Sequence, residues 1–514
     1  MNSATALLQT AADAGCSVCF ANPGTTEMPL VAALDNVTAI RPVLGLFEGV
    51  CTGAADGHAR MTDRPALTLL HLGPGFANGS ANLHNARRAF SPVVNLIGDH
   101  ASWHVGADPP LASDIESLAR PVSRWVTTSA CADALPTDAA RAIEASLTGE
   151  RGVASLVLPV DLQIADGAQP ARVALPSPAA ASSDAILAAA QALREAERPM
   201  LLLGGRSLRE KALVSAARIA AASGARLVGE VFPARHERGA GLPAPERLPY
   251  FPEQALEFLA PSDAIVLAGA AAPVAFFGYE GIPGELAPAG SLRTAFGPEH
   301  DASASLAALA EALDAPASVP PASAPLPEAP TGPLTSGTIG AALARALPEG
   351  AIVVDEAITS ALPFFLQSSG AAPHALLALT GGAIGQGLPV AAGAAIARPD
   401  RKVVAFQADG SGAYTLQALW TMVREQLDVV VLLCSNRTYR ILQIELGRAN
   451  IAEPGPAARR LVNLDAPELD WCALARGFGL PAERTQRIGD SELLARALEI
   501  AFAEPGPHFI ELVL

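Results

Sequence analysis

The segment ADGSGAYTLQALWTMVREQLDVVVLLCSN, residues 408–436, joins two apolar runs that are each followed by a polar residue. Asp409 comes directly after the run KVVAFQA, and Asn436 comes shortly after the run VVVLLC. Continuous apolar runs separated by a helical stretch predict buried parallel strands in an α/β domain. The carboxyl ends of such strands share one edge of the sheet, where open α/β sheets bind ligands. We therefore expect Asp409 and Asn436 to lie at that edge.

Oxygen-bearing side chains at this edge suit a metal ion and a phosphate group. The carboxylate of Asp409 and the amide oxygen of Asn436 are hard ligands of the kind that Mg²⁺ prefers. The turn Gly410-Ser411-Gly412 starts a predicted helix, where backbone N–H groups are free to bind phosphate. A helix-capping aspartate and a turn asparagine would give the same pattern, so this interpretation depends on the rest of the chain.

The same unit of aliphatic strand, Gly- or Asp-bearing turn and Ala/Leu-rich helix recurs along the 514 residues. Two Pro/Ala/Ser-rich stretches, 167–184 and 315–334, have the stiff and extended composition of linkers. They divide the chain into predicted domains 1–166, 185–314 and 335–514, each of ordinary α/β size. The predicted fold is α/β, with three domains that each enclose a parallel sheet between helices.

Charge and composition exclude several classes of function. The net charge of −16 disfavours a nucleic-acid partner, which needs a clustered basic surface. No uninterrupted apolar run of about 18 residues is present, so we expect no membrane span. The two lysines, Lys211 and Lys402, both lie in charged stretches, which disfavours Schiff-base chemistry. The start of the chain lacks a signal-peptide pattern and the six cysteines are scattered, so we expect reduced thiols in a cytoplasmic protein.

The opening segment resembles the thiamine-diphosphate signature, in which GDG is followed by about 24 to 27 residues and NN. Here the motif reads Ala408-Asp409-Gly410 and Ser435-Asn436, and both departures fall on positions that are not metal ligands. The resemblance implies that Asp409, Asn436 and the backbone carbonyl of Thr438 hold Mg²⁺. The cofactor-binding residues that it implies in this segment are Gly410, Ser411 and Tyr439.

The first block resembles the pyrimidine-binding domain of the benzoylformate decarboxylase and acetolactate synthase group. The resemblance rests on FANPGTTEMPLVAAL, residues 20–34, and on the stretch 44–99 that begins LGLFEGV. It makes Glu48 the carboxylate that bonds to the cofactor aminopyrimidine, which promotes removal of the C2 proton of the thiazolium. Alone, Glu48 would equally be a first-turn helix acid. Further cofactor-binding residues implied in this block are Asn22, Pro23 and Gly24.

The third block carries two more stretches that are similar to the family. In LTGGAIGQGLPVAAG, residues 379–393, Ile384 takes the position of the aliphatic wedge under the thiazolium. Gly382 takes the position whose carbonyl accepts from the cofactor 4′-amino group. In VVDEAITSALP, residues 353–363, Thr359 is the implied phosphate contact.

The central block resembles the nucleotide-fold-like central domain of the family, which holds FAD in acetolactate synthases. Its stretch GGRSLREK, residues 204–211, is a poor phosphate loop, and the block has no clear dinucleotide fingerprint. We therefore expect no FAD.

Two residues bear on the reaction. His71 aligns with the active-site histidine of benzoylformate decarboxylase, and Thr25 aligns with the serine that grips the substrate carboxylate. The second histidine of that enzyme maps onto Gly278, so proton transfer would differ here. A histidine that only packs at a strand end is the other interpretation of His71.

The resemblance implies a non-oxidative 2-oxo acid decarboxylase that releases CO₂ and an aldehyde. The alternatives are a carboligase that joins two 2-oxo acids and a cofactor-binding protein without turnover. The substrate is a small molecule that fold analogy does not identify. The resemblance also implies a homodimer or homotetramer in which Glu48 of one subunit meets Asp409 and Asn436 of another.

Overall fold

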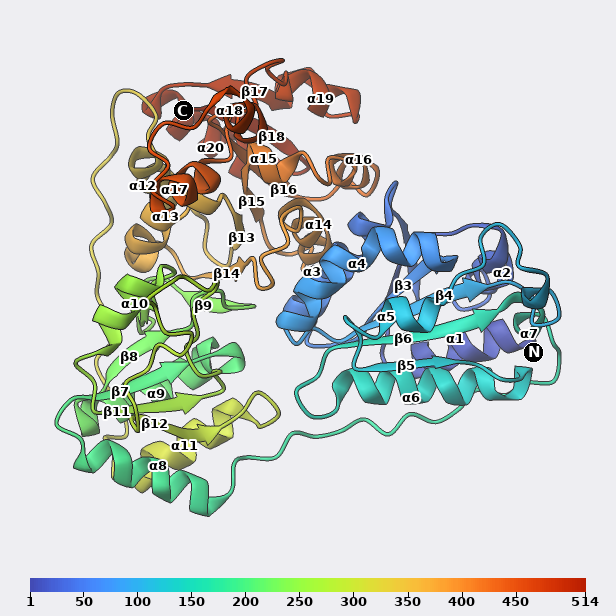
Figure 1. Cartoon of the computed structure of the whole chain (residues 1–514), viewed down its shortest axis with the longest axis horizontal. Coiled ribbons are helices and arrows are strands. Elements are labelled where there is room, and N and C mark those ends of the chain that lie inside the picture. The colour runs from blue at the N-terminus through green and yellow to red at the C-terminus, as the bar shows by residue number, and fades with distance from the viewer.

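The computed structural model describes residues 1–514 and contains three β-sheets (Figure 1). The N-terminal sheet has the strand order β2-β1-β3-β4-β6-β5, and all neighbouring pairs are parallel. Its strands are β1 (Val18–Asn22), β2 (Arg41–Leu44), β3 (Ala66–His71), β4 (Val93–Asp99), β5 (Trp125–Thr128) and β6 (Val153–Pro159). Its helices are α1 (Ser3–Asp13), α2 (Met28–Leu34), α3 (Glu48–Thr62), α4 (Leu72–Arg88), α5 (Ile115–Ala119), α6 (Leu135–Leu147) and α7 (Val160–Gln163).

The central sheet is also parallel throughout, in the order β10-β8-β7-β11-β12. Its strands are β7 (Pro199–Leu203), β8 (Arg226–Gly229), β10 (Glu246–Arg247), β11 (Ala264–Ala268) and β12 (Leu292–Phe296). Its helices are α8 (Ser183–Glu195), α9 (Glu210–Ser223), α10 (Pro252–Leu259) and α11 (Ala302–Ala312). The 3₁₀ helix η4 (Gly205–Leu208) directly follows β7 at its carboxyl end.

The C-terminal sheet has the order β17-β18-β16-β15-β13-β14-β9. Its strands are β13 (Ile352–Glu356), β14 (His374–Ala378), β15 (Val403–Ala408), β16 (Val429–Ser435), β17 (Thr485–Ile488), β18 (His508–Val513) and β9 (His236–Arg238). Its helices are α12 (Ser336–Ala346), α13 (Leu362–Gln367), α14 (Gly387–Ala397), α15 (Asp409–Gly412), α16 (Gln417–Arg424), α17 (Arg440–Arg448), α18 (Pro456–Val462), α19 (Trp471–Gly477) and α20 (Ser491–Ala503). Strand β9 pairs antiparallel with β14 although it belongs to the central stretch of sequence, so one strand crosses the division that the sequence predicts.

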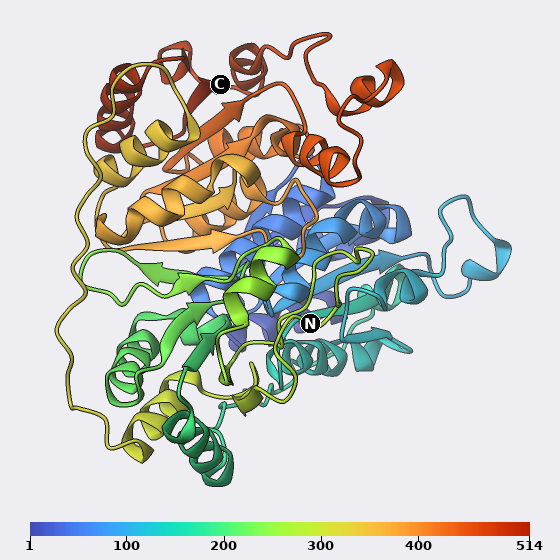
Figure 2. The ribbon, with the colours of Figure 1, turned by 60° about the vertical axis from the view of Figure 1, so that its left-hand side comes forward.

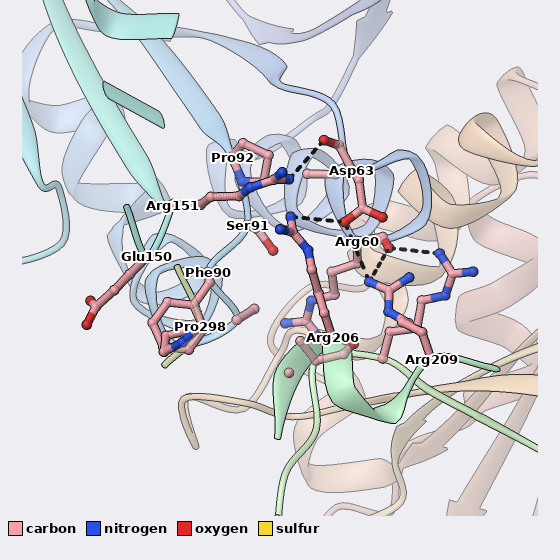
Figure 3. A pocket seen from close by; sticks show the side chains of 15 residues that line it. Arg60, Asp63, Phe90, Ser91, Pro92, Glu150, Arg151, Arg206, Arg209 and Pro298 are labelled. Carbon is pink, nitrogen blue, oxygen red and sulfur yellow. Dashed lines mark hydrogen bonds and ion pairs between the residues drawn. The ribbon is translucent and has the colours of Figure 1, made fainter. Parts of the chain in front are cut away.

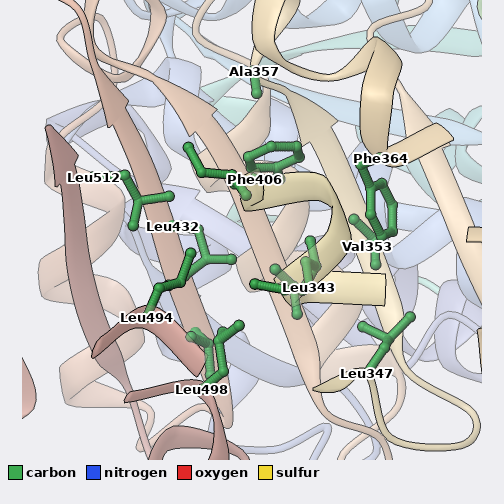
Figure 4. Close-up of a cluster of buried hydrophobic side chains, with 14 of the residues drawn as sticks. Leu343, Leu347, Val353, Ala357, Phe364, Phe406, Leu432, Leu494, Leu498 and Leu512 are labelled. Atoms are coloured by element: carbon green, nitrogen blue, oxygen red, sulfur yellow. The ribbon is translucent and has the colours of Figure 1, made fainter. Parts of the chain in front are cut away.

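Each sheet is covered by helices on both faces. Successive strand residues point to opposite sides, so each strand contributes side chains to both layers. In β13, Val353 belongs to one buried cluster, and Ile352 and Val354 belong to another. Figure 4 shows the first of these clusters, where leucines from α12 and α20 pack on aromatic and aliphatic side chains of the strands. The continuous apolar runs of the sequence are thus explained by burial on both faces. No helix of the chain has the length and apolarity needed to cross a membrane.

The two Pro-rich stretches connect the sheets. Residues 167–182 contain no helix or strand and run along the outside of the molecule to α8 (Figure 1). Residues 313–335 likewise contain no regular element except isolated bridges, and they run along the surface to α12 (Figure 1). Both stretches have the extended form that their composition predicts.

Helices α3 and α14 hold the N-terminal and C-terminal parts together. The α3 residue Arg60 is buried and paired with Asp56 at 2.6 Å. Its guanidinium also donates to the carbonyl of Ala378 at 2.8 Å and to Oγ1 of Thr380 at 3.0 Å. The backbones of the two helices approach so closely that a side chain at Gly393 would overlap α3. The helix that begins at Glu48 is therefore fixed against the glycine-rich segment before α14.

Candidate active site

A glutamate and a histidine meet at the carboxyl ends of the neighbouring strands β1 and β3. Nδ1 of His71 lies 2.8 Å from Oε2 of Glu27, whose side chain is fully buried. Oε2 also accepts from the backbone N–H of Gly24 at 2.7 Å, and Oγ1 of Thr26 donates to Oε1 at 2.5 Å. Because a carboxylate engages Nδ1, we assign the ring proton to Nδ1, which leaves Nε2 for a ligand.

Glu48 lies next to this pair. It is the first residue of α3, it is buried, and its Oε2 accepts from Nδ2 of Asn78 at 3.0 Å. A Cβ atom at Gly75 would lie 3.0 Å from Oε1 of Glu48 and 3.4 Å from Cβ of His71. Glu48 and His71 therefore flank Gly75, and any larger residue there would press on both. Gly24 is constrained similarly, since a side chain would overlap the His71 ring.

Asp409 and Asn436 follow the parallel neighbours β15 and β16 at one edge of the C-terminal sheet. Asp409 is buried and accepts backbone N–H bonds from Gly410 at 2.8 Å and from Arg437 at 2.6 Å. Burial nevertheless raises the pKa of the Asp409 carboxyl above its ordinary value. Oδ1 of Asn436 accepts from the backbone N–H of Thr438 at 3.0 Å. The Gly410 N–H, expected to be free, is thus bonded to the neighbouring carboxylate.

A second buried carboxylate organises the glycine-rich loop. Glu356 is the last residue of β13, and its Oε1 accepts from the N–H groups of Gly385 at 2.9 Å and Gln386 at 3.0 Å. Its Oε2 accepts from the N–H of Gly387 at 2.8 Å and from Nε2 of Gln407 at 2.6 Å. Burial raises the pKa of Glu356, while these four hydrogen bonds favour the ionised form.

The same loop contacts helix α4 of the N-terminal part. Nδ2 of Asn82 donates to the carbonyl of Gly49 at 2.8 Å and lies 3.3 Å from the carbonyl of Gly385. Nδ2 of Asn85 donates to the carbonyl of Ala383 at 2.7 Å. The first turn of α3 and the loop before α14 therefore share neighbours on one helix.

Three non-glycine residues beside the predicted site have left-handed backbone angles. Leu72 has φ 54°, Ile358 has φ 50° and Arg437 has φ 57°. They adjoin the predicted histidine, the predicted phosphate-contacting Thr359 and the predicted metal-ligating asparagine, respectively. Such angles are costly for side-chain-bearing residues, most of all for a β-branched one, and they gather at functional sites.

Comparison with known proteins identifies the family. The thiamine pyrophosphate enzyme N-terminal TPP binding domain matches residues 1–118, and the C-terminal TPP binding domain matches residues 364–512. Benzoylformate decarboxylase of Pseudomonas aeruginosa is 31% identical to the chain, over 97% of the chain and 96% of that protein. The chain belongs to the thiamine-diphosphate-dependent enzyme family.

Other relatives of this thiamine-diphosphate-dependent enzyme differ in the reaction that their names give. A Mycobacterium tuberculosis protein, provisionally named acetolactate synthase large subunit IlvX, is 48% identical over 100% of the chain and 99% of that protein. The structure of 4-hydroxybenzoylformate decarboxylase from Rhodococcus jostii RHA1 superposes with a TM-score of 0.84. It is 26% identical and covers 99% of the chain and 98% of that protein. The family therefore includes decarboxylases and acetolactate synthases.

The residues present fit a divalent cation. Asp409 is a buried carboxylate that receives only backbone donors, since Arg437 directs its guanidinium toward Glu468 at 3.8 Å. A cation would compensate the buried charge, and carboxylate, amide and carbonyl oxygens suit Mg²⁺. The ring of Tyr439 packs so closely on Gly410 that a side chain at Gly410 would overlap it. Only glycine therefore fits at this position of the motif.

The remaining predicted residues of this half lie around the same loop. Oγ of Ser411 donates to the backbone carbonyl of Glu356 at 3.2 Å, so it braces the end of β13. Gly382 has φ 76°, and a Cβ there would lie 2.7 Å from the ring of Phe276. Ile384 is partly buried two residues further along the loop. An aromatic residue of the central domain thus borders the loop that the family resemblance assigns to the cofactor.

The predicted residues of the N-terminal part lie in different environments. Nδ2 of Asn22 donates to the carbonyl of Gly45 at 2.8 Å, which ties the ends of β1 and β2 together. Pro23 and Gly24 follow directly, and Gly24 contacts the histidine described above. Thr25 is exposed at the start of the 3₁₀ helix Thr25–Glu27. Its hydroxyl is therefore accessible, although it makes no hydrogen bond within the chain.

Sequence reasoning missed two carboxylates, Glu27 and Glu356. Both lie within stretches that resemble the family, NPGTTE and VVDEAITSALP, but neither was predicted to have a role of its own. Their partners lie 44 residues away at His71 and about 30 residues away at Gly385–Gly387. The available signal was an acidic residue within a family stretch, at or just after the end of a strand. The residue that it contacts depends on which strands are neighbours, which the sequence alone does not reveal.

Proposed function

We propose that the chain is a non-oxidative 2-oxo acid decarboxylase that uses thiamine diphosphate and Mg²⁺. The observation that carries the proposal is the Glu27–His71 pair beside Glu48. In this proposal, activation of the cofactor uses the carboxylate of Glu48 and does not involve a histidine. A histidine held by a buried glutamate adds a group that moves a proton to or from the substrate carbon.

The roles of the residues follow from this arrangement. When bound, thiamine diphosphate supplies the carbon nucleophile and accepts the electrons of the bond to the departing CO₂. Glu48, shielded from water, holds a proton at the aminopyrimidine. His71 uses Nε2 for proton transfer, and Glu27 fixes the tautomer and the orientation of its ring. Thr25 offers its hydroxyl to the substrate carboxylate.

On the other side of the site, we assign Mg²⁺ to Asp409, Asn436 and the carbonyl of Thr438. The further cofactor contacts in this proposal are Asn22, Pro23, Gly24, Thr359, Gly382, Ile384, Gly410, Ser411 and Tyr439. The proposal assigns no second histidine, because the position that aligns with it is Gly278, where a Cβ would have no neighbour within 4 Å. The adjacent Tyr279 is engaged by Glu445, its hydroxyl lying 3.1 Å from Oε2.

The proposal includes three domains, 1–166, 185–314 and 335–514, and assembly into a homodimer or homotetramer with sites between subunits. Apolar side chains near the site edges are exposed in the single chain, including Leu46 at 44% and Leu442 at 44%. The β4–α5 connection stands out from the body of the molecule (Figure 2), and its Trp103 is 78% exposed. Contact with a second subunit would remove these apolar side chains from water. All six cysteines are unpaired, which supports a cytoplasmic location.

The second candidate is a carboligase that joins two 2-oxo acids. It is favoured by the 48% identity to the protein provisionally named acetolactate synthase large subunit. The deciding experiment incubates the protein with thiamine diphosphate, Mg²⁺ and a panel of 2-oxo acids, and it measures CO₂ and the organic product. An aldehyde supports the decarboxylase, whereas an acyloin in stoichiometric amount supports the carboligase. Tight cofactor binding without CO₂ from any substrate would leave only a cofactor-binding protein.

A further inference from the structure

A polar cavity lies where the N-terminal and central parts meet, and the chemistry described above does not use it (Figure 3). It is lined by the carboxyl-terminal end of α3, by the turn Glu150–Arg151 and by η4 with the residues that follow it. Glu48 is at the opposite end of α3. At about 1.5 Å per residue, the two ends of this 15-residue helix are roughly 20 Å apart. The cavity is therefore distinct from the candidate active site.

Arginine dominates the cavity. Its five arginines are Arg60, Arg151, Arg206, Arg209 and Arg235. The lining contains only two carboxylates, Asp63 and Glu150, and Glu150 lies on the far side from Arg209 (Figure 3). Arg60 and Arg235 have additional acidic partners, Asp56 and Glu237, outside the lining. Even with those included, the arginines outnumber the carboxylates, in a chain whose net charge is −16.

Arg60 is well hydrogen-bonded, but the other four guanidinium groups keep donors without a good acceptor. Nη2 of Arg206 lies 3.4 Å and Nη2 of Arg209 lies 3.6 Å from the same oxygen, Oδ1 of Asp63. Charge-assisted bonds are ordinarily about 2.7–2.9 Å, so one carboxylate is shared loosely between two cations. The Nε atoms of Arg209 and Arg235 are buried without any acceptor. Arg151 reaches only the backbone carbonyl of Asp63, at 3.3 Å.

The arginines also make one another's positive charge less favourable, as their pKa values show. Burial, together with nearby arginines, lowers the pKa of Arg209 to about 10. Burial and Arg206 lower the pKa of Arg151 to about 10 as well. The side chains of Arg206 and Arg209 are 27% and 18% exposed, and partly buried cations without sufficient counter-charge are unfavourable unless an anion binds among them. The cost of assembling these groups is therefore expected to be recovered by a ligand.

We propose that this cavity binds a phosphate-type oxyanion, either inorganic phosphate or the phosphate group of a larger molecule. The cavity volume is about 40 Å³, and a single water needs roughly 10–15 Å³ on the same scale. That is room for one tetrahedral group and excludes an enclosed nucleotide. Guanidinium groups suit such a ligand because their paired N–H donors match the spacing of phosphate oxygens.

The site is placed to act on the candidate active site without contacting it. Arg60 lines the cavity and also donates to Ala378 and Thr380, which lead into the glycine-rich loop. Asp63 is the C-cap of α3, the helix that begins with Glu48. An anion that draws Arg206 and Arg209 away from Asp63 would change the support of that helix end. The proposal does not depend on which 2-oxo acid reaction the enzyme performs.

The test is calorimetric titration of inorganic phosphate into protein saturated with thiamine diphosphate and Mg²⁺, so that the diphosphate site is filled. Ionic strength is held constant with chloride, because exposed charges are screened by salt. We expect saturable binding with Kd below about 10 mM, and Arg206→Gln and Arg209→Gln should each weaken it at least tenfold, roughly the loss of one charge-assisted contact. Arg293→Gln, an exposed arginine of the same domain outside the cavity, should leave it unchanged. Binding that is absent, or equal in all three variants, would overturn the proposal.

A gain-of-binding variant separates this role from a purely structural one. Asp63 has φ 57°, which asparagine tolerates, so Asp63→Asn should fold. It removes the carboxylate that competes for Arg206 and Arg209, and phosphate should bind several-fold more tightly. Weaker or unchanged binding in Asp63→Asn would contradict the proposal even if the arginine variants failed to fold. Adenosine 5′-monophosphate serves as the monoester probe, and binding tenfold tighter than phosphate would identify a larger ligand.

Discussion

The imidazole of His71 is held by Glu27, whose Oε2 lies 2.8 Å from Nδ1 and whose side chain is fully buried. The pair joins the 3₁₀ helix after β1 to the last residue of the neighbouring strand β3, and it leaves Nε2 as the reactive nitrogen. Glu27 also accepts from Gly24 and Thr26, so its carboxylate has little freedom to move. The histidine is therefore fixed in orientation and not merely packed at a strand end.

The first prediction concerns Glu27→Gln. The variant keeps the shape of the side chain but places an amide N–H₂ among donors. The Nδ1–H of His71 then loses its acceptor, or the ring proton moves to Nε2. We expect kcat to fall by roughly 10²-fold with little change in KM, as for loss of a proton-transfer group. Steady-state kinetics with the substrate from the 2-oxo acid panel measure this, and Glu257→Gln, an exposed acid, is the control. Unchanged kcat in Glu27→Gln would return His71 to a packing role.

The second prediction concerns Glu48→Gln. An amide in this position cannot take up the proton at the aminopyrimidine, whereas the contacts to the diphosphate side are untouched. We expect the affinity for thiamine diphosphate to change less than about tenfold while turnover falls by two orders of magnitude or more. Nuclear magnetic resonance of C2–H exchange in the bound cofactor isolates the affected step. Exchange at the wild-type rate would show that another group activates the cofactor.

The sequence was sufficient for the strands that carry this site, because each is a continuous apolar run ended by a polar residue. Asp409 and Asn436 could be placed at one sheet edge for that reason. Strand β9 could not be predicted, since His236–Arg238 is three residues long, polar, and pairs with a strand more than a hundred residues away. The partnership of Glu27 with His71 was hidden for a related reason. It exists only because β1 and β3 are neighbours, which periodicity within either strand does not reveal.

The third prediction concerns the pH dependence of stability. Burial raises the pKa of Asp409 in the folded protein, so the folded state binds its proton more tightly than the unfolded chain, where the pKa is about 3.9. Without cofactor, the contribution of Asp409 to stability should therefore fall as pH rises from about 4 through the raised pKa. Mg²⁺ with thiamine diphosphate should reverse this trend, because the ionised carboxylate becomes a ligand.

Urea unfolding between about pH 4.5 and 7, with and without the metal and cofactor, measures this effect. The Asp409→Asn variant isolates it, since other buried carboxyls titrate equally in both proteins. We expect the variant to lose most of the stabilisation by cofactor and metal at neutral pH and to show a flatter pH dependence without them. Full stabilisation of Asp409→Asn by Mg²⁺ and cofactor would place the metal elsewhere.

The fourth prediction concerns Glu356, the buried acid beneath the glycine-rich loop. Its two oxygens accept from three consecutive backbone N–H groups of the loop and from Gln407. In Glu356→Gln the new N–H₂ group points at other N–H donors and cannot accept their hydrogen bonds. Each buried donor left without an acceptor lowers the stability by about 1–3 kcal/mol. We expect a lower urea midpoint and weaker cofactor binding together, because the loop before α14 carries Gly382 and Ile384. The matched control is Glu349→Gln, an exposed acid before the same strand, which should stay within about 0.5 kcal/mol of wild type. If Glu356→Gln matched that control, the loop would owe its conformation to its glycines and to α4 alone.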